Sequence, residues 1–242
     1  MNRPRILVNV AMTADGKIDS ATRKGATISS PADKARVDRM RASVDAVLVG
    51  GRTLLNEDPK LTVKSAGLRA ERVQKGWSEN PAKVGVVSNL ETVFEVTSKG
   101  HGRTQPLHDF LTSGPARRII FTTKRTPSNV ISRLDKAGAE IYVLGGKVVD
   151  LRRVMKSLYK QGIGSVLVEG GGTLIAELFR LNLVDELTIY IAPRIFGGTS
   201  APTLVDGKGF LDDQAPRLKL DSVEKFNDEN SILICYSVEH KE

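Results

Sequence analysis

A carboxylate and three glycines stand where an apolar stretch gives way to a helical one. Ser165 to Val168 predicts a buried strand, and Glu169 follows it directly. Gly170-Gly171-Gly172 then leads into a predicted helix over Thr173 to Leu181. The start of a helix presents unpaired backbone N–H groups, and its dipole favours an anion there. Since glycine lets a phosphate approach closely, the junction predicts a phosphate or dinucleotide site; a tight connection without a ligand is the alternative.

Polar residues also follow the other predicted strands. Asp15 follows the first, Thr53 the second, and Ser88 with Asn89 the third. In α/β proteins, ligands bind beyond the carboxyl ends of strands, where Glu169 would accept hydrogen bonds from sugar hydroxyls or an amino group. A rim of polar groups at strand ends is typical of a binding site.

The familiar catalytic patterns are missing. The strict G-x-G-x-x-G fingerprint is not present, and no P-loop lysine follows the glycines. The three histidines, His101, His108 and His240, are far apart, and no metal-ligand spacing occurs. We therefore expect no catalytic side chain and no metal. An enzyme of this kind is often one whose cofactor carries the chemistry.

Composition limits the class of protein. The chain has 242 residues, is 40% hydrophobic, and shows neither a membrane-spanning run nor a signal peptide. Cys235 is the only cysteine, which fits a reducing cytoplasm. The net charge is +8, but the basic residues are scattered, and neither zinc-finger spacing nor an aromatic-rich strand is present. A small anionic substrate explains this charge as well as a nucleic acid does, and we expect no nucleic-acid or membrane partner.

Alternation of strands and helices predicts an α/β sheet with parallel strands. Three strands near the C-terminus have no long helix between the last two, and we expect antiparallel strands at that edge. Two polar stretches, 64–81 and 98–117, are interpreted as surface loops or partly ordered insertions. We expect a single domain over 1–242. The predicted strands are Arg5 to Ala11, Asp45 to Gly50, Lys83 to Ser88, Arg118 to Thr122, Glu140 to Leu144, Ser165 to Val168, Glu186 to Ala192, Arg217 to Val223 and Ile232 to Val238.

Four segments together resemble a known family, the reductases of riboflavin biosynthesis that act on 2,5-diamino-6-ribosylamino-4(3H)-pyrimidinone 5′-phosphate. The archaeal and fungal stand-alone enzymes and the reductase half of the bacterial deaminase–reductase carry similar segments. Here they are NVAMTADGKI from Asn9, ISSPADKARVDRMRASVDAVLVGGRTLLNEDPKLTV from Ile28, LVEGGGTL from Leu167 and VDELTIYIAPRIFGG from Val184. They are spread from end to end, and their combination is far more specific than any one of them.

The resemblance implies a fold and an activity. The fold is dihydrofolate-reductase-like, a mixed central sheet flanked by helices, and two copies form a homodimer. The cofactor is NADPH. The substrate is a small sugar-phosphate pyrimidine, and hydride transfer to C1 of its ring-opened ribose gives the ribitylamino product.

The resemblance also implies binding residues. On the cofactor side, Ser88 and Asn89 stand where the family has an Asp-Ser pair, so the sequence departs from the pattern there. The other residues implied to contact NADPH are Ala11, Thr27, Thr53, Glu57, Gly171, Gly172, Thr173 and Leu174. On the substrate side, Arg41 matches an arginine that meets the phosphate, and Leu61 a residue over the pyrimidine. Lys64 stands where bacterial relatives have a basic residue, and Glu169 binds the ribose hydroxyls.

Two other interpretations stay open. The first is an NADPH reductase of the same fold that acts on a different heterocycle, dihydrofolate included. The second is a basic protein that binds RNA and has no response to NADPH. Arg41 has an alternative of its own, because most arginines on helices are solvated.

Overall fold

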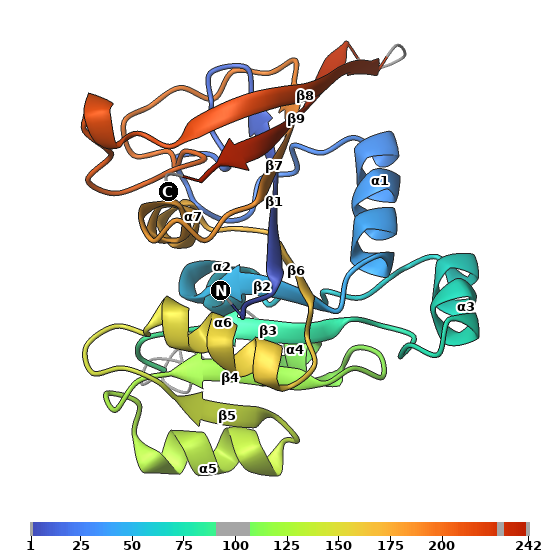
Figure 1. The fold of residues 1–242 in the computed structure, drawn as a ribbon, viewed down its shortest axis with the longest axis vertical. Coiled ribbons are helices and arrows are strands. Elements are labelled where there is room, and N and C mark those ends of the chain that lie inside the picture. The colour runs from blue at the N-terminus through green and yellow to red at the C-terminus, as the bar shows by residue number, and fades with distance from the viewer. Residues whose placement is uncertain (1, 91–106, 227–229, 241–242) are drawn as a thin grey trace. The chain divides into compact units, whose positions relative to one another are not determined.

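The computed structural model describes residues 2–90, 107–226 and 230–240 (Figure 1). The chain forms two compact units, one of residues 1–4 and 38–166, the other of residues 5–37 and 167–242. It passes between them three times: between residues 4 and 5, within helix α1 (Pro31–Ala42) and within strand β6 (Ser165–Val168). The single reductase domain over 1–242 stays a prediction. Among the helices described, none is long and apolar enough to cross a membrane.

The first unit is built on four parallel strands in the order β5-β4-β3-β2. Strands β2, β3 and β4 are almost entirely buried, which explains their mainly apolar sequences, since strands covered on both faces need no polar alternation. Strand β5, at the end of this order, is only half-buried. Helix α2 packs against β2 and β3, and α5 against β5 (Figure 1). The elements are β2 (Ala46–Gly50), α2 (Gly51–Glu57), α3 (Ala66–Gln74), β3 (Ala82–Val86), α4 (His108–Thr112), β4 (Arg118–Thr122), α5 (Ser128–Lys136), β5 (Glu140–Val143) and α6 (Leu151–Lys160).

The helices of this unit begin where the chain supplies caps. The carboxylate of Asp150 accepts a hydrogen bond from the Arg153 N–H at the start of α6. The hydroxyl of Ser65 accepts one from Leu68 at the start of α3. Such caps satisfy backbone donors that a helix leaves unpaired. One face of α6 is buried, and it consists of Leu151, Val154, Met155 and Leu158, which recur at helical spacing.

The second unit has a mixed set of strands. Strand β1 (Arg5–Thr13) is parallel to β7 (Glu186–Ala192), with Asn9 opposite Thr188. Strand β9 (Ser231–Glu239) is antiparallel to both β7 and β8 (Arg217–Phe226). The antiparallel strands expected near the C-terminus are thus confirmed. Helix α7 (Gly172–Arg180) and the short 3-10 helix η3 (Asp212–Gln214) complete the unit. Part of its core consists of Ile28, Tyr190, Ala192 and Leu233.

Both polar stretches contain structure that their composition hid. Residues 64–81 include α3, and the buried residue of this helix is Arg72, whose guanidinium donates to the carbonyl oxygens of Ser78, Ala42 and Val44. Of 98–117, residues 98–106 lie outside the described part of the chain. The rest includes α4, whose Phe110 is buried. Polar contacts fix both helices, and hydrophobic periodicity cannot reveal such contacts.

Candidate functional site

The glycine turn lies between β6 and α7, as the sequence predicts. Gly170 has φ +111°, a value that side chains rarely allow, and Gly171 is the extended residue before α7. The carbonyl oxygen of Gly171 accepts hydrogen bonds from Leu174 and Ile175, so the helix starts immediately. Glu169 is half-buried, Thr173 is exposed and Leu174 is half-buried. The junction therefore combines a carboxylate with the positive end of a nine-residue helix.

Gly172 has a structural reason of its own to be glycine. A Cβ atom there would clash with the carbonyl oxygen of Thr203. The Asp206 N–H donates to the Gly172 carbonyl at 3.2 Å, and the Asp206 carboxylate holds Thr203 through its N–H and its hydroxyl. The start of α7 is thus closely packed on the 203–206 loop. The cofactor contact of Gly172 stays a prediction.

Two other cofactor candidates lie in the same unit. Ala11 is in β1 and packs against the core formed by Ile28 and its neighbours. Thr27 is exposed, and its carbonyl oxygen accepts a hydrogen bond from Arg194 Nη1 at 2.8 Å.

A carboxylate orders the loop after β7. Asp15, in the turn after β1, accepts hydrogen bonds from the backbone N–H groups of Phe196 and Gly197. The hydroxyl of Thr13 also donates to it. This hydroxyl, with smaller contributions from the two N–H groups, lowers the pKa of Asp15 to about 2. The turn after β1 and the loop after β7 are therefore joined by an ionised carboxylate at neutral pH.

In the first unit, Thr53 and Glu57 are on α2, which starts directly after β2. They are four residues apart, so both lie on one face of the helix. Thr53 is half-buried and Glu57 exposed. Gly51, the first residue of this helix, lies close to the chain that follows β3. A Cβ atom at Gly51 would be only 3.3 Å from Val87 Cγ1.

Ser88 and Asn89 follow β3, and both are half-buried. The carbonyl oxygen of Ser88 accepts a hydrogen bond from Thr123 Oγ1 at 2.6 Å. Its hydroxyl accepts one from the Val149 N–H at 3.2 Å. Ser88 thus ties the chain after β3 to the chain after β4 and to the approach to α6.

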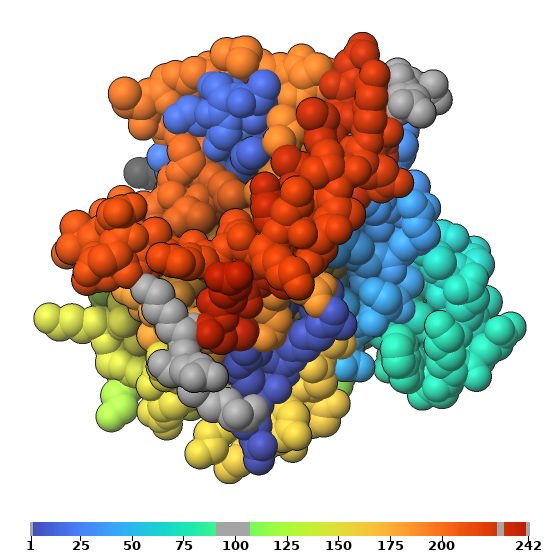
Figure 2. Space-filling model, turned by 45° about the horizontal axis from the view of Figure 1, so that its top comes forward, coloured from blue at the N-terminus to red at the C-terminus, as the bar shows by residue number. Residues whose placement is uncertain are grey.

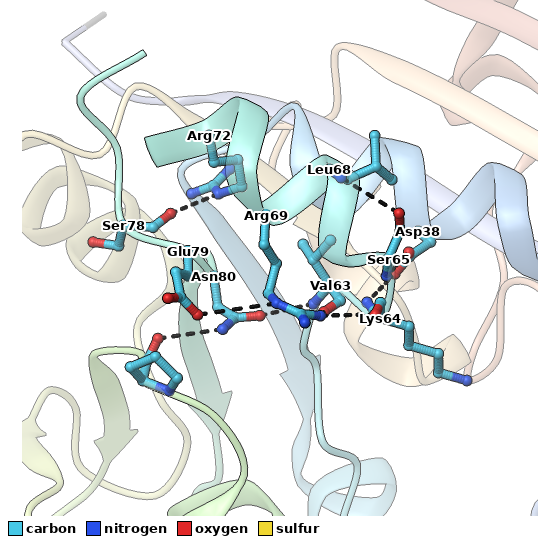
Figure 3. Close-up of polar contacts among 11 residues, drawn as sticks. Asp38, Val63, Lys64, Ser65, Leu68, Arg69, Arg72, Ser78, Glu79 and Asn80 are labelled. Atoms are coloured by element: carbon cyan, nitrogen blue, oxygen red, sulfur yellow. Dashed lines mark hydrogen bonds and ion pairs between the residues drawn. The ribbon is translucent and has the colours of Figure 1, made fainter. Parts of the chain in front are cut away.

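The segment 61–65 is held by side chains from helices α1 and α3 and from the loop before β3 (Figure 3). The Asp38 carboxylate, on α1, accepts hydrogen bonds from Lys64 N at 2.6 Å and Ser65 N at 2.8 Å. Asn80 Oδ1 accepts one from Val63 N at 2.8 Å. Arg69 Nη1, on α3, donates to the carbonyl oxygens of Val63 and Lys64. Backbone groups at 63, 64 and 65 are therefore fixed by buried or half-buried partners.

These contacts bring three of the predicted substrate residues together. Arg41 Nη1 donates to the Thr62 carbonyl at 3.1 Å, which places Arg41 beside the segment that carries Leu61 and Lys64. Leu61 is buried and has φ +50°, an unusual conformation for leucine. Lys64 is exposed, and its side chain extends away from the hydrogen bonds of the segment (Figure 3). The fourth residue, Glu169, belongs to the other unit.

Sequence reasoning missed the residues that support this segment. Asp38 and Asn80 were not identified, although both are buried and bind its backbone. Asp58, which follows α2, also binds backbone N–H groups. Its buried carboxylate accepts hydrogen bonds from Asp109 N and Phe110 N, and so caps α4. Charged residues in a helix or loop normally indicate solvent, so only the fold reveals these roles. Within the described residues, no cluster of three or more His, Cys, Asp or Glu side chains can hold a metal ion.

Comparison with known proteins decides the family. Residues 4–232 match the family model described as the RibD C-terminal domain. The chain belongs to this family. It is 37% identical over 226 residues to the 2,5-diamino-6-ribosylamino-4(3H)-pyrimidinone 5′-phosphate reductase of Archaeoglobus fulgidus, covering 93% of this chain and 95% of that one. A protein of the same name from Methanothermobacter thermautotrophicus is 34% identical over 236 residues, covering 98% and 99%.

A solved structure agrees with the fold. RibD of Acinetobacter baumannii superimposes with a TM-score of 0.74 at 22% identity. The match covers 99% of this chain and 59% of the RibD chain. The family resemblance and the expected mixed α/β fold are therefore confirmed.

Proposed function

We propose that this protein is an oxidoreductase of riboflavin biosynthesis that uses NADPH to reduce 2,5-diamino-6-ribosylamino-4(3H)-pyrimidinone 5′-phosphate. The similarity to the two archaeal reductases carries the proposal, because it covers almost the whole length of each protein. When bound, NADPH supplies the hydride that C1 of the ring-opened ribose accepts. The imine at C1 becomes an amine with uptake of a proton, and the product carries a ribityl group.

The proposed cofactor residues suit a phosphorylated dinucleotide. The start of α7 presents backbone N–H groups, and no side chain at Gly171 blocks an approaching phosphate. Thr53 and Glu57 on α2 offer a hydroxyl and a carboxylate for hydrogen bonds. Ala11 and Thr27 are assigned to the nicotinamide side of the cofactor. Ser88 and Asn89, at the end of β3, and Thr173 and Leu174, at the start of α7, are assigned to further contacts with NADPH.

The proposed substrate residues divide by chemistry. Arg41 and Lys64 are assigned to the phosphate, because a guanidinium and an ammonium both favour a dianion. Leu61 offers an apolar surface to the pyrimidine. Glu169 is assigned to the ribose, whose hydroxyls donate hydrogen bonds to a carboxylate. Contacts of Arg41 with the Leu61–Lys64 segment support a common role for the three.

We further infer that two copies pair as a homodimer and that neither a nucleic acid nor a membrane is a partner. The homodimer is inferred from the family resemblance. The absence of a nucleic-acid partner is inferred from the scattered basic residues, since nucleic-acid binding needs clustered positive charge.

The test is oxidation of NADPH by the purified protein, followed at the absorbance of reduced nicotinamide. We expect oxidation that requires the ribosylaminopyrimidine phosphate and does not occur with dihydrofolate. Oxidation with dihydrofolate alone would favour a reductase of another heterocycle. Salt-sensitive RNA binding with no NADPH-induced rise in melting temperature would favour the RNA-binding alternative, since a ligand at 100 times its Kd stabilises a protein by about 2.7 kcal/mol.

A further inference from the structure

Strand β8 is an open edge. In the strand order of the described residues it is last, and β9 is its one neighbour. Nine of its ten residues are exposed, and only Phe226 is half-buried. Figure 2 shows the orange-red and red C-terminal strands lying open on the face in view. An uncovered edge presents unpaired N–H and C=O groups to any strand that can pair with it.

One face of this edge is apolar. Leu218, Leu220 and Val223 are opposite Val238, Tyr236 and Ile234 of β9, which alternate along that strand and so share a face. Their exposed fractions are 38%, 54% and 59%, and Ile232 on the same face of β9 is 40% exposed. Several large apolar side chains on one open face usually indicate an interaction surface.

A β-bulge in the middle of β8 determines which of its residues share a face. The register shifts between Leu220 and Ser222, because Asp221 is an extra residue that is not paired in the register with β9, although its carboxylate accepts a hydrogen bond from the Ser237 hydroxyl. The midpoint of the ten-residue strand lies between Asp221 and Ser222, with 217–221 before it and 222–226 after it. Leu220 and Val223, at equal distances from this midpoint, pair with Tyr236 and Ile234 on one face of β9. Lys219 and Glu224, one residue further out, pair with Ser237 and Leu233 on the other face.

This symmetry makes β8 complementary to itself. In an antiparallel pair of two copies with the two-fold axis between Asp221 and Ser222, Leu220 is opposite Val223 of the partner subunit. Lys219 is opposite Glu224 of the partner subunit, and the two-fold axis repeats each pair. Charges on a free edge normally keep other strands away. In this register they attract, and the exposed apolar residues cover each other.

We propose that β8 is the surface through which two copies of this chain pair, edge to edge and antiparallel, with the two-fold axis between Asp221 and Ser222. The proposal rests on the homodimer proposed above and names its interface. Its occupant is a second copy because opposite charges and apolar residues meet only when the strand faces itself in this register.

Charge reversal tests the register. Lys219→Glu places two glutamates opposite each other, and Glu224→Lys places two lysines, at both symmetry-related positions. Each single variant should weaken the dimer by about tenfold or more in Kd. The double variant restores the opposite charges and should return the Kd to within about threefold of the starting protein. The measurement is mass by sedimentation over a range of protein concentrations.

Controls separate the possible failures. Lys160→Glu, at an exposed position of α6 in the other unit, makes the same change in net charge as Lys219→Glu and should leave the dimer intact. Circular dichroism should show that every variant is folded. A starting protein that is monomeric at all concentrations contradicts both the homodimer and its interface. A dimer unaffected by the single variants contradicts the interface alone, and loss in the singles without recovery in the double variant contradicts the register.

Discussion

Glu169 shows what one residue is expected to contribute. The carboxylate lies at the end of β6 immediately before the glycine turn, and the proposed function assigns it to the substrate. Glu169→Gln should lower kcat/KM for the pyrimidine substrate by about tenfold to a hundredfold, the usual effect of losing charge-assisted hydrogen bonds. The Kd for NADPH, measured by nicotinamide fluorescence, should stay near normal. Equal losses in both quantities would count against a substrate role.

Substitution of Gly171 should affect NADPH binding and leave substrate binding nearly unchanged. Gly171→Val places a branched side chain at the start of α7, where the proposed phosphate site needs close approach of the backbone. The Kd for NADPH should rise by about tenfold or more, while the Kd for the substrate changes little. Gly164→Ala is the matched control, since its Cβ would make only an ordinary contact with Asp45. Unchanged NADPH affinity in the Gly171 variant would remove the argument for a phosphate site at this turn.

Asp15 predicts a dependence on pH. Its pKa is lowered from 3.8 to about 2 by the Thr13 hydroxyl and the two N–H groups of the 196–197 loop. A carboxyl whose pKa is lower in the folded state stabilises the protein above its unfolded pKa. That stabilisation is lost as the pH falls from about 3.8 to about 2. Carbon NMR should give a midpoint for Asp15 near 2, and Asp15→Asn should remove this part of the acid dependence; a midpoint near 3.8 would contradict the contacts described.

At the level of elements, most of the sheet could be predicted. The bounds of β4 and β7 are those expected from the sequence, because their apolar residues are bounded by polar or turn residues on both sides. Helix α3 was not predicted. Its buried residue is Arg72, held by three carbonyl oxygens, and hydrophobic spacing carries no signal for such a helix. The glycine turn was predicted, whereas the supports of segment 61–65 depend on residues distant in sequence.

The hold on segment 61–65 can be tested through Asp38. Asp38→Asn keeps the shape of the side chain. It replaces one of the two accepting carboxylate oxygens with an NH₂ group, a donor that would face a backbone N–H group. The free energy of unfolding should fall by about 1–3 kcal/mol in urea titrations. KM for the substrate should rise more than kcat falls, because Leu61 and Lys64 lose their fixed position.

Arg39→Gln is the control, on the same helix but exposed. Its free energy of unfolding should change by no more than about 0.5 kcal/mol. If Asp38→Asn lowers stability but leaves KM unchanged, the segment is structural and takes no part in substrate binding.

At the scale of the whole molecule, the family follows from segments spread along the chain, while the roles of single residues rest on the proposed function. Proposed cofactor and substrate residues occur in both compact units. The family determines the fold, and the fold by itself fits several heterocyclic substrates. Hydride transfer to C1 of the ribose is the step that separates the proposed reaction from those alternatives.

The most direct measurement uses NADPH that carries deuterium at the transferable position of the nicotinamide. After reaction with the ribosylaminopyrimidine phosphate, NMR and mass spectrometry locate the label in the product. We predict deuterium at C1 of the ribityl chain. A product with no label, or with the label in the pyrimidine ring, would contradict the proposed reaction.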